Sequence, residues 1–175
     1  MINTYNLFAV PVIHGKFVIP ISIHKKILKY AEENYVNKDS FSCRNGFQKY
    51  GDFDGKKELD KELNIYLNNM FRLNIEYSWL NVLGENSHNN PHRHPGSTTQ
   101  YAGVLYLSSE NSNITFTKDS EIFEIKPKLF EYLIFPDNLV HYVLPENRGE
   151  KRISYAFNMS TIEQGEKNGW TNTNN

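Results

Sequence analysis

Three of the chain's six histidines lie close together in the stretch HNNPHRH, at residues 88–94. Side chains at positions i and i+2 of a β-strand point to the same face, so His92 and His94 are expected to point in one direction. Converging neutral imidazoles are ligands for divalent transition metals, and this spacing suits zinc or copper as well as iron. The stretch therefore predicts a metal site, and the alternative is a polar turn that happens to be rich in histidine.

A third protein ligand has to come from elsewhere in the chain. His141 is favoured, because the surrounding sequence FPDNLVHYVLP predicts a strand, a Pro-Asp-Asn turn and a second strand. Two ligands on one strand and a third on a later strand form a facial triad, which leaves coordination positions open. The other histidines are expected to be ordinary surface or hydrogen-bonding residues, and they are His14, His24 and His88.

Eleven positions after His141, Arg152 opens the segment RISYAFNM. Strand alternation predicts one face that carries Arg152, Ser154, Ala156 and Asn158, and an apolar opposite face. An unpaired buried charge is unfavourable, so an arginine here predicts an anionic partner. A dicarboxylate bound by the guanidinium, with Ser154 hydrogen-bonding beside it, meets this need. The alternative is a structural salt bridge to Glu131 or Asp137.

The rest of the chain predicts a framework for these residues. Its 175 residues suit a single domain, 1–175, that buries a core without disulfides. Two helices are expected at about 22–35 and 56–72, within a helical part that spans about 20–72. From about 75 to 160, short apolar runs alternate with turn residues, the pattern of an all-β sandwich or closed barrel. The helices should pack on the outside of this β unit.

Local features give further expectations. The first helix opens with Ser22 as its cap. Residues 6–19 predict strands around a His14–Gly15 turn, whereas the polar, turn-rich residues 37–55 predict a surface loop. The aromatic residues of that loop form a substrate lid or pack onto the barrel, and they are Phe41, Phe47, Tyr50 and Phe53. The apolar stripe of the second helix is formed by Leu59, Leu63, Tyr66, Leu67 and Met70. The C-terminal GWTNTNN should fray.

Composition and charge exclude several classes of partner. The formal net charge is −1 and the pI is about 6.6, with both signs interspersed, so we expect neither a nucleic-acid nor a membrane partner. Partners are then small molecules or another protein.

The single cysteine, Cys43, rules out an internal disulfide and fits a reducing compartment. The apolar LFAVPVI lacks the flanks of a signal peptide and is too short to span a bilayer, so a soluble, cytoplasmic protein is expected.

The C-terminal half resembles the iron(II)- and 2-oxoglutarate-dependent oxygenases. It is most similar to the branch related to prolyl 4-hydroxylases, and within it to a small family of microbial and phage origin. The similarity covers roughly residues 77–160 and rests on WLNVLG, HRHPGS, YAGVLYL, LIFPDNLVHYVLP and RISYAFN in this order. It implies a double-stranded β-helix, or jelly roll, with supporting α-helices. It also implies Fe(II) as the metal, with 2-oxoglutarate and O2 as cosubstrates.

The resemblance assigns roles to individual residues. His92 matches the first metal ligand and His141 the distal histidine. Arg152 matches the arginine that binds the C5 carboxylate of 2-oxoglutarate, and Ser154 completes an Arg-x-Ser pair. Tyr106, in VLYL, matches a tyrosine that hydrogen-bonds the same carboxylate in prolyl hydroxylases.

His94 departs from the pattern of most relatives, which carry Asp or Glu at this position. The small family has a His-x-His here too, so we expect His94 to be a metal ligand. The site then lacks its usual anionic ligand. In a second register, His94 would begin a His-x-Gly motif with Gly96, resembling the halogenating branch, where the missing carboxylate leaves room for chloride.

The implied function is that of a dioxygenase that converts 2-oxoglutarate to succinate and CO2 and hydroxylates a C–H bond. The substrate is a prolyl or other protein side chain, or a small molecule. One alternative is a cupin-like three-histidine metalloprotein that does not use 2-oxoglutarate, which would not need Arg152 to point at the metal. Another is a non-catalytic domain that binds iron or 2-oxoglutarate without turnover.

Overall fold

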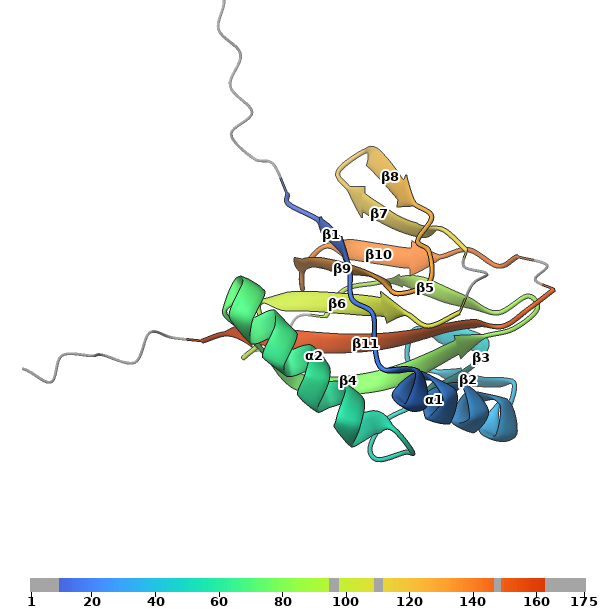
Figure 1. Cartoon of the computed structure of the whole chain (residues 1–175). Helices are drawn as coiled ribbons and strands as arrows, with labels where there is room; N and C mark the ends of the chain where they lie inside the picture. Colours follow the sequence, from blue (N-terminus) through green and yellow to red (C-terminus); the bar gives the residue numbers. More distant parts are fainter. Residues whose placement is uncertain (1–9, 95–97, 109–111, 147–148, 163–175) are drawn as a thin grey trace, which may run out of the picture.

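The computed structural model of the chain describes residues 10–94, 98–108, 112–146 and 149–162 (Figure 1). Two helices and a series of strands follow one another within these ranges. In chain order they are β1 (Ile13–Lys16), α1 (Ile21–Asn34), β2 (Lys38–Ser40), β3 (Cys43–Lys49), α2 (Lys56–Phe71), β4 (Leu73–Leu83), β5 (His88–His92), β6 (Tyr101–Tyr106), β7 (Ile114–Lys118), β8 (Glu121–Ile125), β9 (Glu131–Pro136), β10 (Val140–Val143) and β11 (Arg152–Thr161). The expected tail GWTNTNN lies outside the described residues.

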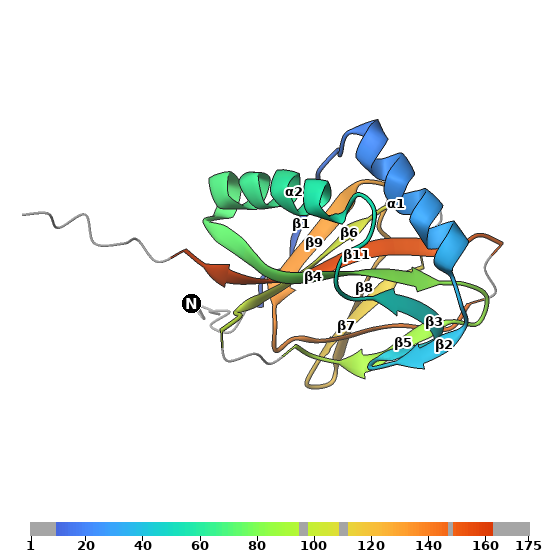
Figure 2. The same ribbon diagram turned by 90° about the horizontal axis from the view of Figure 1, so that it is seen from below.

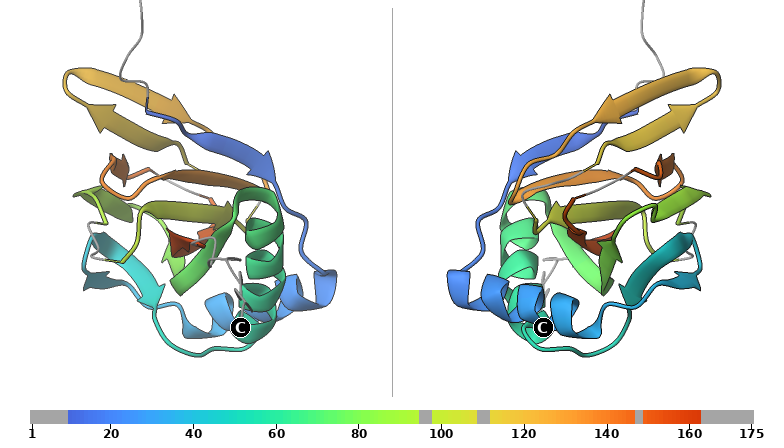
Figure 3. Two further views of the ribbon diagram at one scale, coloured as in Figure 1. Left: turned by 90° about the vertical axis from the view of Figure 1, so that its left-hand side faces the viewer. Right: turned by 90° about the vertical axis from the view of Figure 1, so that its right-hand side faces the viewer.

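The described strands form one curled antiparallel sheet, in the order β1-β9-β6-β11-β4-β3-β5-β10-β7-β8, with β2 beside β3. Strand β3 pairs with both β4 and β5, so the sheet turns over at this strand. A larger face and a smaller face therefore oppose each other, as the end-on views show (Figure 3). This mainly-β jelly roll with N-terminal helices confirms the predicted fold class.

Both helices cover the outer side of the larger face, opposite the smaller one (Figure 2). Their buried stripes pack on the sheet, as the sequence periodicity predicts, and the stripe of α2 consists of Leu59, Leu63 and Leu67. Each of these leucines is fully buried, which stabilises the fold by about 1.5 to 3 kcal/mol per side chain. The expectation for Met70 is wrong, because this side chain is 60% exposed near the end of α2. Within the described ranges, neither helix is long and apolar enough to cross a membrane.

Strand β11 separates the helical core from the interior of the curl. Ile153, Tyr155 and Phe157 belong to the core that the helices cover. Arg152, Ser154 and Ala156 line a cavity between the two faces of the sheet. The predicted alternation is therefore confirmed, and it fixes which side chains reach the interior.

The expected surface loop at 37–55 contains strands β2 and β3 instead. β3 carries polar residues, yet it bridges the two faces of the sheet because β4 and β5 supply hydrogen-bonding partners on both sides. This pairing outweighs the weak strand propensity of the segment. Cys43, its first residue, is fully buried.

The expected His14–Gly15 turn is also wrong, because both residues lie inside β1 and pair with Leu133 and Tyr132 of β9. The glycine is required by close packing: a Cβ atom at position 15 would lie 2.4 Å from the Tyr132 hydroxyl oxygen. Helix α1 begins one residue before Ser22, and no side-chain hydrogen bond caps its start. Residues 6–9 of the expected N-terminal strand lie outside the described residues.

Candidate metal centre

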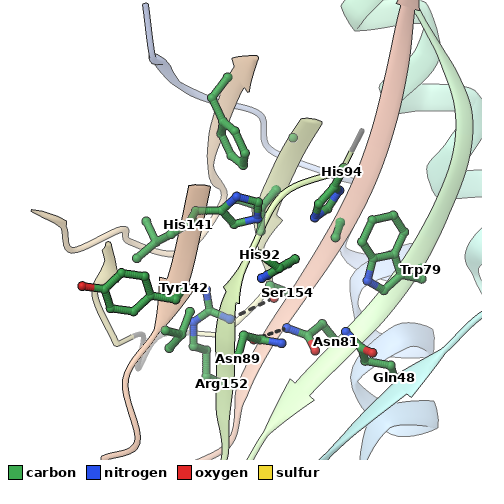
Figure 4. Close-up of a pocket in the computed structure, with 16 residues that line it drawn as sticks. Gln48, Trp79, Asn81, Asn89, His92, His94, His141, Tyr142, Arg152 and Ser154 are labelled. Atoms are coloured by element: carbon green, nitrogen blue, oxygen red, sulfur yellow. Dashed lines mark hydrogen bonds between the residues drawn. The ribbon is translucent and has the colours of Figure 1, made fainter. Parts of the chain in front are cut away.

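His92, His94 and His141 meet in the interior of the curl. His92 ends β5 and is the direct cross-strand partner of His141 in β10, while His94 follows two residues later. The three rings can offer one nitrogen each, and these atoms all lie within 4.8 Å of one another. Figure 4 shows the rings arranged around a common point. The pairing of β5 with β10 is what brings together residues 49 positions apart in the sequence.

Each ring of the triad has an oxygen beside its Nδ1 atom. His92 Nδ1 lies 2.7 Å from the Asn90 main-chain oxygen, and His141 Nδ1 lies 3.0 Å from that of Leu139. His94 Nδ1 lies 2.8 Å from the side-chain Oδ1 of Asn158. An oxygen acceptor places the proton on Nδ1 and leaves the Nε2 lone pair free, which is the tautomer a metal requires.

The triad is neutral at physiological pH. Burial lowers the pKa of His92 to about 4, and it also lowers the pKa of His94 and brings that of His141 well below its usual value. Repulsion among the three rings adds to the effect at His141. Neutral imidazole is the form that binds metals, so the site is ready for a cation without first losing protons.

Arg152 lines the same cavity as the three histidines (Figure 4). Its side chain is 2% exposed, its Nη1 donates to Ser154 Oγ at 3.2 Å, and its guanidinium carbon lies 5.0 Å from the centre of the Tyr106 ring. No carboxylate of the described residues lies within 4.0 Å of it, and Glu131 instead accepts a hydrogen bond from His14 at 2.9 Å. The salt bridge considered for Arg152 is therefore absent from the described part of the chain.

Two buried polar atoms beside this cavity, Arg152 Nε and the Tyr106 hydroxyl, make no hydrogen bond of good geometry with a described residue. The two side chains are nevertheless close enough for the Arg152 cation to act against the rise in the pKa of Tyr106. Burial raises the pKa of Tyr106 to about 12, so its hydroxyl keeps its proton and remains a donor. Leaving such groups unpaired costs about 1 to 3 kcal/mol each, and more for a charged group. Two unpaired donors and the Ser154 hydroxyl are the surroundings that a carboxylate requires, so these residues fit the far carboxylate of 2-oxoglutarate.

A row of side-chain amides continues the polar floor of the cavity beyond Ser154. Asn81 pairs in register with Ser154 on one side and Gln48 on the other. Its Nδ2 donates to Asn89 Oδ1 at 3.2 Å, while its Oδ1 is buried and has no partner within the described ranges. Sequence reasoning missed these residues, although alternation along WLNVLG places Trp79 and Asn81 on the inner face.

A groove opens from the triad to the surface. Its aromatic wall is formed by Phe41, Tyr50, Tyr77 and Trp79, and His92, His94 and Arg93 also line it. Tyr50 and Tyr77 both stack nearly parallel to Trp79, with ring centroids 5.6 and 6.0 Å away. The aromatic residues of 37–55 are thus divided, because Phe47 and Phe53 pack on the helical core while the other two face the groove.

The remaining histidines lie elsewhere. His24 lies on the buried face of α1 and hydrogen-bonds the Leu107 main-chain oxygen at 2.7 Å, and His14 is the partner of Glu131. His88 is the first residue of β5. Gly96, on which the second register of His94 depends, lies outside the described residues.

No protein-family model matches the sequence, and a comparison with curated proteins finds no related sequence. Solved structures do match. A prolyl-4-hydroxylase from Pseudomonas putida has a TM-score of 0.63 at 13% identity, with 86% of this chain and 92% of that chain covered. A prolyl hydroxylase from Trichoplax adhaerens, in complex with a hypoxia inducible factor peptide fragment, has a TM-score of 0.63 at 12% identity, with 85% and 83% covered.

The non-heme alpha ketoglutarate dependent epimerase SnoN from nogalamycin biosynthesis also matches, with a TM-score of 0.63 at 15% identity and coverage of 86% and 77%. Identities this low establish the fold and leave the reaction open, since hydroxylases and an epimerase share it. The chain has the jelly-roll fold of the prolyl hydroxylases and 2OG-Fe(II) oxygenases, and its group of three histidines fits that family.

Proposed function

We propose that the chain is an iron(II)- and 2-oxoglutarate-dependent dioxygenase. In this proposal His92, His94 and His141 hold the metal, while Arg152 binds the far carboxylate of 2-oxoglutarate with Ser154 and Tyr106 as further donors. The observation that carries the proposal is a buried guanidinium with no described carboxylate within 4.0 Å, in the same cavity as three neutral imidazoles. A cupin-like metalloprotein that does not bind 2-oxoglutarate would not need this arginine in its cavity.

When bound, iron and 2-oxoglutarate supply the oxidising chemistry, in which O2 and the oxo acid yield succinate, CO2 and an oxygen atom for a substrate C–H bond. The protein's residues bind, orient and shield. Three neutral ligands leave a divalent cation uncompensated, so a dianionic oxo acid balances the metal and Arg152 adds one further positive charge. Phe116 and Phe135 pack around His141 and keep water from that side of the site.

The groove beside His92 and His94 is where we place the substrate. Its aromatic wall and its single arginine, Arg93, suit a peptide or a small molecule with apolar groups, and no described acidic residue lines it. The peptide seen with the Trichoplax adhaerens prolyl hydroxylase supports a protein side chain as the target. A prolyl or other protein side chain is therefore our preferred substrate.

Succinate formation tests the activity. Protein loaded with Fe(II) under anaerobic conditions should convert 2-oxoglutarate to succinate when O2 is admitted, even slowly and without a substrate. His141→Gln should abolish succinate formation, because it removes the most deeply buried ligand. The matched control His14→Gln changes a histidine outside the cavity and should retain the native rate. Equal succinate formation by both variants would contradict the proposed metal site.

A further inference from the structure

One ligand of the triad is held differently from the other two. His92 and His141 each donate to a main-chain oxygen two residues earlier in the same segment. The partner of His94 is a side chain, Asn158, which lies 64 residues away on β11. The orientation of His94 therefore depends on one particular residue, whereas the other two orientations follow from the backbone.

Both ends of the Asn158 amide are engaged. Its Oδ1 lies 2.8 Å from His94 Nδ1, and its Nδ2 donates to the Tyr77 hydroxyl at 2.5 Å. The side chain is 1% exposed, so water does not offer a ready substitute. Trp79 lies against the His94 ring, with centroids 5.5 Å apart, and limits its tilt. Together these contacts leave His94 one tautomer and one direction.

We propose that Asn158 is the positioning residue that lets a histidine stand where related sites carry a carboxylate. The inference rests on the proposed function, because it takes His94 to be a metal ligand. A carboxylate has no tautomer to fix, since its two oxygens are equivalent and either can bind a metal. An imidazole has two different nitrogens, and only a hydrogen-bond acceptor at Nδ1 keeps Nε2 unprotonated for the metal. Asn158 is thus required because residue 94 is a histidine.

A double-mutant cycle separates this role from a merely structural one. The probe is Co(II), titrated under anaerobic conditions and followed by its visible spectrum. Asn158→Leu should weaken Co(II) binding by 10- to 100-fold in the native background, the usual effect of losing an outer partner of a metal ligand. In the His94→Asp background, the same substitution should change the Co(II) affinity by less than about threefold, because an aspartate has no tautomer to be fixed.

Two controls sharpen the cycle. Asn158→Asp keeps an oxygen acceptor beside Nδ1 and should restore near-native Co(II) affinity. Asn64→Leu removes another asparagine hydrogen bond, from the Ile75 main-chain nitrogen to Asn64 Oδ1 at 2.8 Å, on the helical side of the sheet. It should lower the melting temperature and leave Co(II) binding unchanged. An equal loss from Asn158→Leu in both backgrounds would overturn the positioning role while leaving the metal site intact.

The native protein gives a test that depends on no variant. In the metal-free state, nitrogen NMR of the histidine rings should show His94 protonated at Nδ1, as the contact with Asn158 Oδ1 requires. Protonation at Nε2 would mean that the amide faces His94 with its nitrogen, and it would overturn the inference. If the native protein binds no Co(II) at all, the proposed metal site falls and this inference falls with it.

Discussion

The two faces of β11 carry polar groups that differ in their hydrogen bonding. On the face toward the helices, the Tyr155 hydroxyl donates to Asp60 at 2.6 Å, and Ser78 donates to the same carboxylate at 2.8 Å. Lys56 lies 2.5 Å from the other oxygen of Asp60. On the face toward the cavity, Arg152 Nε has no partner among the residues described.

This contrast distinguishes a structural cluster from the proposed binding site. The outer cluster of Tyr155, Ser78, Asp60 and Lys56 satisfies its own hydrogen bonds, so it ties α2 to β4 and β11 without help. The inner group leaves donors unpaired, which is unfavourable unless a ligand completes it. In our proposal the same strand contributes to stability through one face and to binding through the other, and substitutions should separate the two effects.

The largest expected effect is on the inner face. Arg152→Met should weaken 2-oxoglutarate binding by roughly 2 to 5 kcal/mol, the usual loss when one member of a buried charge pair is removed. The affinity for Co(II) should stay nearly native. The melting temperature should hold or rise, because the substitution removes a buried cation that has no described carboxylate within 4.0 Å. Titration with 2-oxoglutarate and thermal unfolding measure the two quantities. A variant that unfolds without a selective loss of 2-oxoglutarate affinity would show that Arg152 is structural after all.

The pH dependence of stability should come from the inner histidines. The pKa of His92 is about 4 in the folded protein and 6.5 when unfolded, so between these values the unfolded chain binds more protons. The contribution of a neutral His92 to the unfolding free energy is therefore fully present above pH 6.5, and it is lost as the pH falls toward 4. In chelator-treated protein, His92 alone should lower the unfolding free energy by roughly 2 kcal/mol between pH 7 and 5. Denaturant unfolding at both pH values measures this change in the unfolding free energy. If His92→Gln shows the same change as the native protein, His92 is not its source.

Removing single histidines of the proposed metal site should give a smaller, defined loss of metal affinity. His92→Ala and His94→Ala should each weaken Fe(II) binding at least tenfold, about 1.4 kcal/mol, whereas His94→Asp should retain metal. Anaerobic equilibrium binding measures these affinities. Normal iron occupancy in His92→Ala would favour the other register, in which His94 is the first ligand, and halide should then perturb the spectrum of the bound metal.

The smallest effect belongs to the outer face. Tyr155→Phe removes the hydroxyl that bonds to both Asp60 and Ser78. Asp60 and Ser78 still pair with each other and with Lys56, so the substitution should destabilise the fold by only about 1 kcal/mol. The affinities for Co(II) and 2-oxoglutarate should not change. Chemical denaturation and the same titrations check both statements. A selective loss of 2-oxoglutarate binding in this variant would remove the distinction between the two faces.

Features that depend on local periodicity could be predicted from the sequence. The alternation in RISYAFNM assigned Arg152 and Ser154 to the interior, and the spacing of leucines located α2. The His-x-His pair and a distant histidine predicted the group that the pairing of β5 with β10 brings together.

Features that depend on distant partners could not be predicted in this way. β3 is a strand because β4 and β5 pair with it, and Gly15 is a glycine because the Tyr132 ring lies over it. Asn158 becomes informative only when its amide is seen beside His94. In each case the residue that determines the structure is distant in the sequence, so the local composition does not predict it.

If one cavity binds both a metal and 2-oxoglutarate, an anaerobic titration will detect the two ligands together. Fe(II) is added to the protein, 2-oxoglutarate follows, and the visible charge-transfer absorbance of the iron chelate is recorded. We expect one chelate per chain, and Arg152→Met should require a far higher 2-oxoglutarate concentration than the native protein to form it. Iron binding without this absorbance would show that the cavity does not bind 2-oxoglutarate at the metal. The same 2-oxoglutarate requirement in Arg152→Met and the native protein would show that Arg152 does not bind it.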